Sequence, residues 1–200
     1  MSSFCSAYLP PIGYMVSAIK GQVILIEAWE TYSKQTCRNH CNIYGPNGKQ
    51  TLTIPVIKVN GNHTQIRDIR ISDSHSWQNS HWRSIVSAYS NSPYFLYYSD
   101  SFIPIFRKHF IFLLDLNYHL LEIIVQTLKL STTIQFSQDF MVSESWQERE
   151  LLVSKKYRYV HPRYQQVFSD RYGFISNLSI IDLIFNMGPE SVGYLTRISA

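Results

Sequence analysis

The spacing of apolar positions near the start of the chain predicts a parallel βαβ unit. Residues 3–9 are rich in apolar side chains, and residues 12–19 place them at helical spacing before Gly21, a typical helix stop. Residues 22–28 form a continuous aliphatic run of strand length, which is typical of a strand covered on both faces. Two strands joined by one helix in this order form a parallel pair.

Turn residues predict that an antiparallel portion is then added to the sheet. The Gly45-Pro46-Asn47-Gly48 turn joins residues 42–44 to residues 50–59 as a hairpin with an irregular second strand. The isoleucines at positions 66, 69 and 71 stand among charged residues and indicate a further, edge-like strand.

Helical spacing dominates the middle of the chain and returns near its end. In the middle of the chain we expect a helix from Trp77 to the Ser92-Pro93 stop with Ser76 as its cap, an aromatic stretch over residues 94–112 interrupted at Pro104, and a helix from Asp115 to Leu128. A strand over residues 132–136, a short helix over 146–153 and a basic-aromatic connector over 155–159 are expected next. A strand around residues 164–166 and a helix over 179–186 complete the predicted elements. The fold class is therefore α/β, as a single domain over residues 1–200. Its mixed sheet opens with the βαβ unit and the hairpin portion, and the middle helices and C-terminal helix pack on it.

Composition narrows the classes of protein. The 200 residues carry 16% charged and 14% aromatic side chains with three cysteines, which excludes a disordered chain, a coiled coil and a disulfide scaffold. No apolar run is long enough to span a bilayer, so we expect a cytoplasmic protein. The net charge of +4 favours anionic ligands, but no long Lys/Arg run indicates nucleic acid as a partner.

Charged side chains gather directly after the second predicted strand. Glu27, Glu30, Lys34 and Arg38 lie within a short segment, and the carboxyl ends of parallel strands are where α/β proteins bind ligands. A carboxylate beside a cation can orient or deprotonate an amine, while Lys and Arg can bind a carboxylate or diphosphate. The alternative is an exposed loop with surface salt bridges.

Histidines and cysteines are weaker candidates. His81 lies on the apolar face of its predicted helix and is either a general base or a hydrogen-bonded structural residue. Cys37 and Cys41 lack the paired spacing of zinc sites, so no metal site is predicted and the cofactor is left open. Asp182 and Asn186 share a face of the last helix, where we favour structural roles.

An ordered series of motifs is similar to one known family over nearly the whole chain. The motifs are Ala7-Tyr8-Leu9-Pro10-Pro11-Ile12-Gly13-Tyr14, Glu30-Thr31-Tyr32-Ser33-Lys34-Gln35 with Arg38-Asn39, Leu52-Thr53-Ile54-Pro55-Val56, Leu114-Asp115-Leu116-Asn117, Tyr164-Gln165-Gln166-Val167-Phe168, and the stretch from Leu178 to Pro189. Together they resemble the WbqC-like protein family.

The resemblance implies a bacterial protein often encoded among O-antigen or other surface-polysaccharide genes, with a proposed role as a glycine or other aminoacyl transferase to an amino sugar. The chain departs from the family pattern at two places. Residues 26–30 read Ile-Glu-Ala-Trp-Glu where many relatives have an Asp-rich stretch, and residues 38–40 read Arg-Asn-His instead of Arg-Asn-Arg. These departures leave a carboxylate but remove a cation.

The leading hypothesis is a transferase that adds an acyl or aminoacyl group, such as glycyl, to a nucleotide-activated amino sugar. The expected catalytic residue is Glu27 or Glu30, which would orient or deprotonate the amine, with His81 as a further candidate base. The expected substrate-binding residues are Lys34 and Arg38, which would bind the anionic portion, and Asn39, Tyr8 and Tyr32, which would form hydrogen bonds. Glu27→Gln is expected to abolish turnover and to affect folding only as a surface substitution does. The alternative is a non-catalytic component that binds a sugar or nucleotide sugar in the same pathway. The partner is in either case a small molecule, and the oligomeric state is left open.

Overall fold

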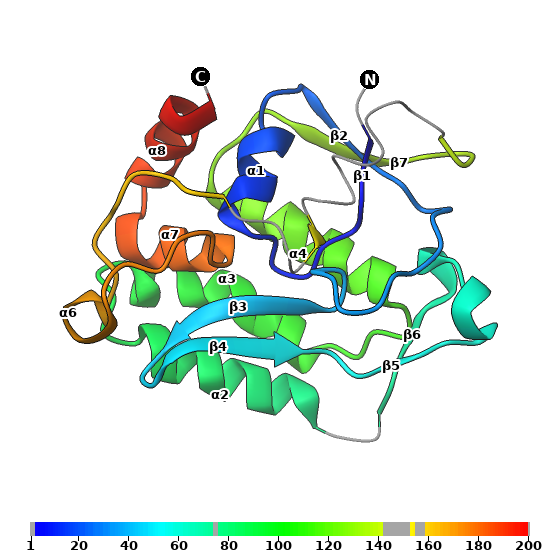
Figure 1. Ribbon diagram of the computed structural model, residues 1–200, viewed down its shortest axis with the longest axis horizontal. Coiled ribbons are helices and arrows are strands. Elements are labelled where there is room, and N and C mark those ends of the chain that lie inside the picture. The colour runs from blue at the N-terminus through cyan, green and yellow to red at the C-terminus, as the bar shows by residue number, and fades with distance from the viewer. Residues whose placement is uncertain (1–2, 74–75, 142–152, 155–158, 200) are drawn as a thin grey trace.

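The aliphatic run predicted as a buried strand forms the centre of a parallel sheet. In the computed structural model, β2 (Val23–Ile26) pairs with β1 (Ser3–Phe4) on one side and with β7 (Thr133–Phe136) on the other, both in parallel (Figure 1). The structure describes residues 3–73, 76–141, 153–154 and 159–199. The register aligns Phe4, Ile26 and Phe136, so the three strands end at the same level.

Helix α1 (Ile12–Ala18) connects β1 to β2, which confirms the predicted βαβ unit. Its own N-cap residue, Pro11, makes no side-chain capping bond. Instead, the first helical N–H groups are bound by the C-terminal part of the chain: Ile12 N donates to Leu178 O at 2.9 Å, and Gly13 N donates to Asn177 Oδ1 at 2.9 Å. Residues near the C-terminus thus cap the first helix of the chain.

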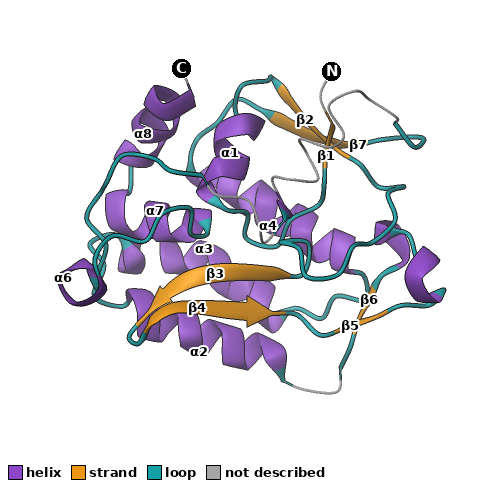
Figure 2. Ribbon diagram, in the orientation of Figure 1, coloured by secondary structure: helices purple, strands orange, loops and turns teal. Residues whose placement is uncertain are grey.

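The predicted hairpin is formed by β3 (His40–Gly45) and β4 (Gly48–Thr53), with Gly48 at φ 94° in the turn. The sheet assignment differs from the prediction. Within the described residues the hairpin is a separate two-stranded sheet, and it packs on helix α2 (Trp77–Tyr89) instead of extending the parallel sheet (Figure 2). A second small pair joins β5 (Val56–Ile57) to β6 (Arg70–Ile71).

The helices predicted after the hairpin are confirmed as α2, α4 (Leu113–Thr127) and α7 (Ile180–Met187). The structure adds α3 (Phe95–Arg107), α6 (Ser169–Tyr172) and α8 (Glu190–Ser199), with short 3-10 turns η1 (Gly61–His63) and η2 (Ile66–Asp68). Ser76 is the N-cap residue of α2, as predicted, although its side chain makes no capping bond.

Several boundaries differ from prediction. Helix α3 continues through Pro104, because the carbonyl left without a donor belongs to the exposed Asp100 and can be solvated. Asp115 lies inside the first turn of α4 and does not cap it. Residues 164–166 form no strand, and α8 was not predicted. The predicted helix over residues 146–153 and the connector over 155–159 fall outside the described residues, apart from Val153 and Tyr159.

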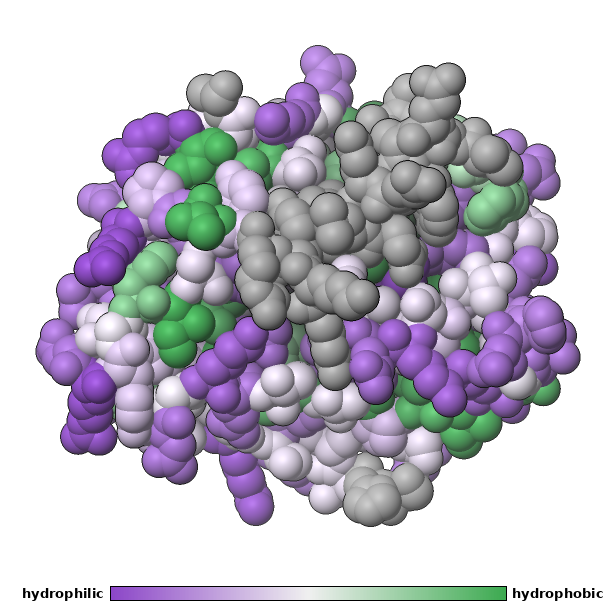
Figure 3. Space-filling model, in the orientation of Figure 1, coloured by the Kyte–Doolittle hydropathy of each residue, from purple (hydrophilic) through white to green (hydrophobic). Residues whose placement is uncertain are grey.

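The core is continuous from the parallel sheet to the C-terminal helices. Among the residues coloured in Figure 3, hydrophilic and intermediate ones predominate, and apolar residues are visible in small separate patches. No helix in the described part of the chain combines the length and apolar character needed to cross a bilayer.

Candidate functional site

Glu27 lies at the carboxyl edge of the parallel sheet, immediately after β2. Its carboxylate accepts hydrogen bonds from Ser137 Oγ at 2.7 Å, Trp29 N at 2.9 Å and Met141 N at 2.9 Å. Ser137 follows β7 directly, so residues that end two neighbouring strands meet here, as expected for this edge. Glu27 is 0% exposed. The three donors hold its carboxylate in one orientation.

The expectation that Glu27→Gln behaves as a surface substitution is wrong. The side chain is fully buried, and each of its two oxygens accepts at least one hydrogen bond. A glutamine would place an NH₂ group opposite one of these donors, and a buried polar group left unsatisfied costs about 1–3 kcal/mol.

Glu30 and Arg38 form a buried ion pair beside the end of β1. Arg38 Nε donates to Glu30 Oε1 at 2.9 Å, and its Nη2 donates to Oε2 of the same carboxylate. The guanidinium also donates to Thr36 Oγ1 and to Cys5 Sγ, both at 3.2 Å. Both charged side chains are 0% exposed. A ligand would therefore have to displace Glu30 to reach the guanidinium directly.

Tyr8 and His81 form a second buried pair, between the segment after β1 and helix α2. Tyr8 Oη lies 2.9 Å from His81 Nδ1, and the Trp77 ring packs edge-on against the imidazole at 5.2 Å. Burial lowers the pKa of His81 to about 4, although a hydrogen bond to the Thr53 backbone opposes the shift. His81 is therefore neutral at pH 7. No hydrogen bond joins this pair to Glu27 among the described residues.

Cations and aromatic rings lie together next to this edge. Lys34 is exposed, Trp29, Lys58 and Arg67 are half-buried, and Tyr32 is buried. Lys58 Nζ is 5.3 Å from the centroid of the Tyr32 ring, and Arg67 Cζ is 3.5 Å from that of Trp29. Partial burial lowers the pKa of Lys58, and the positive charge of the exposed Lys34 lowers it further. We call Trp29, Tyr32, Lys34, Lys58 and Arg67 the basic-aromatic rim.

Asn39, predicted to bind substrate, forms hydrogen bonds to the segment that follows the hairpin. Its Nδ2 donates to Ile54 O at 2.9 Å, and the backbone Ile54 N donates to Asn39 O at 2.8 Å. The side chain is 7% exposed. These bonds fix the path of the chain directly after Arg38.

Asn117, on α4, is a site residue that the sequence reasoning missed. Its Nδ2 donates to Ser6 Oγ and to Arg38 O, both at 2.8 Å. A carbonyl oxygen only accepts, so these bonds fix the orientation of the amide and turn Oδ1 away. That Oδ1 is buried and has no hydrogen-bond partner in the described part of the chain. A single polar residue among the buried leucines of α4 was the available signal.

The unpartnered oxygen belongs to a residue that lines a cavity of about 10 Å³ at the strand ends. The cavity is lined by Ser6, Ala7, Ile26, Leu114, Asn117, Tyr118, Leu121 and Phe136. A cavity of this size is at the lower limit for holding one water molecule. The carboxyl edge therefore offers one free acceptor in a small space.

Asp182 has the structural surroundings expected of it. It is buried and accepts hydrogen bonds from Tyr164 Oη at 2.5 Å and Gln166 Nε2 at 2.9 Å. Burial raises its pKa to about 6, against the effect of these bonds. Asn186 Nδ2 donates to the backbone oxygen of Asp182 at 2.7 Å, within the same helix.

The structure thus brings Glu27, Glu30 and Arg38 to the edge where they were predicted, and it places Tyr8 and His81 together elsewhere. Among the described residues, no group of three or more His, Cys, Asp or Glu side chains is arranged to hold a metal ion.

Comparison with known proteins gives the family. The sequence profile of the WbqC-like protein family matches residues 6–159 and 155–194. The chain belongs to this family. A relative from Mycobacterium tuberculosis (strain ATCC 25618 / H37Rv), named "Uncharacterized protein Rv1507c", is 29% identical over 223 residues, which cover 95% of this chain and 94% of the relative. No solved structure matches the chain.

The two places where this WbqC-like chain departs from the family pattern lie directly after β2 and at the start of β3. His40, where the pattern has a second arginine, begins β3, pairs with Thr53 and is 3% exposed. Glu27 and Glu30 supply the carboxylates of the segment after β2, and one of them is neutralised by Arg38.

Proposed function

We propose that this WbqC-like protein is a cytoplasmic acyl or aminoacyl transferase that acts on the amine of a nucleotide-linked amino sugar during synthesis of O-antigen or another surface polysaccharide. The family's association with such genes supports the pathway. The observation that carries the proposal is the cation pair of the rim: Lys58 Nζ lies 5.3 Å from the centroid of the Tyr32 ring, Tyr32 is two residues from the exposed Lys34, and neither lysine has an ion-pair partner among the described residues. Two unpaired cations next to a strand edge suit a diphosphate.

The strand edge supplies groups that suit the amine. The amine nitrogen would form a bond to the carbonyl carbon of an activated ester or thioester, while the bond from that carbon to its leaving group breaks. The amine proton would pass to a carboxylate and then to the leaving group. Glu27 is the candidate carboxylate, and Asn117 Oδ1 is a candidate acceptor for an N–H group at the same edge. Glu27 is buried and its carboxylate accepts three hydrogen bonds, so a bound amine would have to replace one of these donors.

A second candidate function, non-catalytic binding of the same ligand, is favoured by the burial of the candidate catalytic groups. Glu27, Glu30 and His81 are 0%, 0% and 5% exposed. A binding component needs only the basic-aromatic rim and would have no turnover.

A thermal-shift panel tests ligand binding. The ligands are UDP, UDP-glucosamine, glucosamine and glycine, applied to the wild type, to a Lys34→Ala/Lys58→Ala variant and to Lys49→Ala, a matched control on the exposed side of the hairpin. Ligand at 100 times its Kd adds about 2.7 kcal/mol to stability. We expect a shift with UDP-glucosamine in the wild type and the control that is lost in the double variant. No shift with either nucleotide would contradict both candidate functions.

A turnover assay separates the two candidates. The wild type and Glu27→Gln are incubated with UDP-glucosamine and an acyl or aminoacyl thioester, at a temperature where both are folded, and the N-acylated product is measured. Product from the wild type alone, with binding kept in the variant, supports the transferase. Binding without product supports the non-catalytic component, and equal product from both proteins removes Glu27 from the mechanism.

A further inference from the structure

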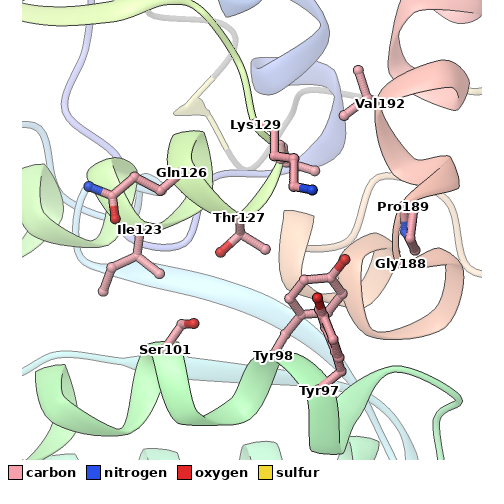
Figure 4. A pocket seen from close by; sticks show the side chains of 11 residues that line it. Tyr97, Tyr98, Ser101, Ile123, Gln126, Thr127, Lys129, Gly188, Pro189 and Val192 are labelled. Atoms are coloured by element: carbon pink, nitrogen blue, oxygen red, sulfur yellow. The ribbon is translucent and has the colours of Figure 1, made fainter.

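A cavity of about 770 Å³ lies at the far end of α4 from Asn117. It is an open cavity between one face of α3, the last turn of α4 and the α7–α8 junction, and it is lined by Tyr97, Tyr98, Ser101, Ile123, Gln126, Thr127, Leu128, Lys129, Gly188, Pro189 and Val192 (Figure 4). Small-molecule sites have volumes of about 300–1,000 Å³, so this cavity has the size of a ligand site.

Polar groups in this cavity are left free by the fold. The hydroxyls of Tyr97, Tyr98, Ser101 and Thr127, the amide of Gln126 and the ammonium of Lys129 make no hydrogen bond or ion pair with other residues in the part of the chain that the structure describes. In Figure 4 the two tyrosine hydroxyls and the Lys129 Nζ point toward the same space. No Asp or Glu is among the lining residues.

Ring packing and backbone conformation fix part of the cavity wall, although Tyr97 itself is 75% exposed. The Tyr97 and Tyr98 rings meet edge to face, with centroids 4.7 Å apart and planes at 85°. Gly188 at φ 53° allows close approach, since a Cβ there would lie 2.5 Å from the Tyr94 ring. Lys129 is held at φ 50° just past the end of α4. The cavity therefore does not depend on long flexible side chains alone.

We propose that this cavity binds an anionic saccharide, in which a sugar ring carries a phosphate or a carboxylate. Sugar rings present hydroxyls at their edges and C–H groups on their faces. The free hydroxyls and amide suit the edges, and the tyrosine rings with Ile123 and Val192 suit the faces. An unpaired lysine without a neighbouring carboxylate among the lining residues selects for negative charge.

The site is separate from the basic-aromatic rim, and the proposal does not rest on the proposed function. Asn117 and Thr127 lie on the same helix, ten residues apart, which corresponds to about 15 Å along its axis. A ligand in the cavity therefore leaves the strand edge free.

The test measures binding by calorimetry with glucose 1-phosphate, glucuronic acid, glucose and inorganic phosphate. The proteins are the wild type, the two cavity variants Lys129→Asn and Ser101→Trp, the rim variant Lys34→Ala/Lys58→Ala and the control Lys49→Gln. Asparagine tolerates positive φ, and Ser101 is exposed on α3, so both variants are expected to fold, which circular dichroism checks.

We expect glucose 1-phosphate, glucuronic acid or both to bind, with the preferred anion identifying the source of the charge, and glucose to bind at least tenfold more weakly. Lys129→Asn should weaken binding at least tenfold, Ser101→Trp should abolish it, and the control should match the wild type. Inorganic phosphate binding as tightly as the sugar anions, affinities unchanged in both variants, or no binding by either sugar anion would overturn the proposal. Loss of binding in Lys34→Ala/Lys58→Ala would also overturn it, since the ligand would then occupy the rim.

Discussion

The buried pair Glu30–Arg38 shows how a charged segment turns inward. The sequence reveals two carboxylates and two cations close together, and this pattern suits an exposed site or a surface loop equally well. A bidentate pair eight residues apart allows burial, because each charge is neutralised and hydrogen-bonded where it lies. The position of the segment was predictable from the strand before it, whereas the burial was not.

Removal of one partner of this pair should be strongly destabilising. In Arg38→Ala, Glu30 would keep a buried charge without its cation, so we expect the free energy of unfolding to fall by about 3–5 kcal/mol. Urea denaturation at pH 7 measures it, and Lys34→Ala, which removes an exposed cation nearby, should stay within about 0.5 kcal/mol of the wild type. A loss below 1 kcal/mol for Arg38→Ala would show that Glu30 is stabilised without the pair.

His81 should make stability depend on pH in the acid range. Its pKa is about 4 in the folded protein and 6.5 in the unfolded chain, so the unfolded chain binds more protons between these values. Its contribution is fully present above pH 6.5 and is lost as pH falls toward 4, by up to about 3 kcal/mol.

Urea denaturation of the wild type and of His81→Gln at pH 7, 5 and 4 tests this dependence. Asp182 has the opposite effect, since its raised pKa favours the folded state at low pH, but it is common to both proteins and cancels in their difference. A constant difference across the three pH values would show that His81 does not titrate with a lowered pKa.

At the scale of elements, apolar periodicity predicted most of the fold. The βαβ unit, the hairpin, α2, α4, α7 and β7 follow from local patterns and are confirmed. The sheet to which the hairpin belongs is decided by its packing on α2, which local patterns do not contain. Helix α8 was missed because Gly193 and the Gly188-Pro189 stop before it argue against a helix, whereas its buried Tyr194 and Leu195 pack onto the core.

The junction of α7 and α8 depends on one glycine. Gly188 has φ 53°, and a Cβ would lie 2.5 Å from ring atoms of Tyr94. Gly188→Ala should therefore cost at least about 1–2 kcal/mol from backbone strain, plus the displacement of a rigid ring. Thermal unfolding gives the effect. Gly193→Ala is the matched control, because a Cβ there meets nothing within 4 Å in a helix that favours alanine. Equal melting temperatures for wild type and Gly188→Ala would contradict the steric account.

At the scale of the molecule, the candidate site is assembled from distant segments. Ser137 Oγ donates to Glu27 from 110 residues further along the chain, and Asn117 Nδ2 donates to Ser6, just after β1, from 111 residues further along. Strand ends could be predicted to lie together because parallel strands impose it. The approach of Asn117 could not, since it depends on how α4 crosses the sheet.

Asn177 ties the two ends of the fold together. Its Oδ1 caps α1 at Gly13 N, and its own φ is 56°. Asn177→Ala loses the cap and keeps the strained backbone, so we expect a loss of about 1–2 kcal/mol in urea denaturation. Asn177→Asp retains an acceptor and tolerates this φ, and should recover most of the stability. Similar losses in both variants would show that capping contributes little.

During synthesis, α1 and β2 leave the ribosome well before the residues that cap and flank them. The cap on α1 comes from 164 residues further along the chain, and the second neighbour of β2 comes about 110 residues later. At about 5–20 residues per second, the nascent βαβ segment waits roughly 5–30 s for the part of the chain that completes it. During that interval the aliphatic strand β2 lacks its β7 neighbour and α1 lacks its cap, so apolar surface that the folded protein buries is without its partners.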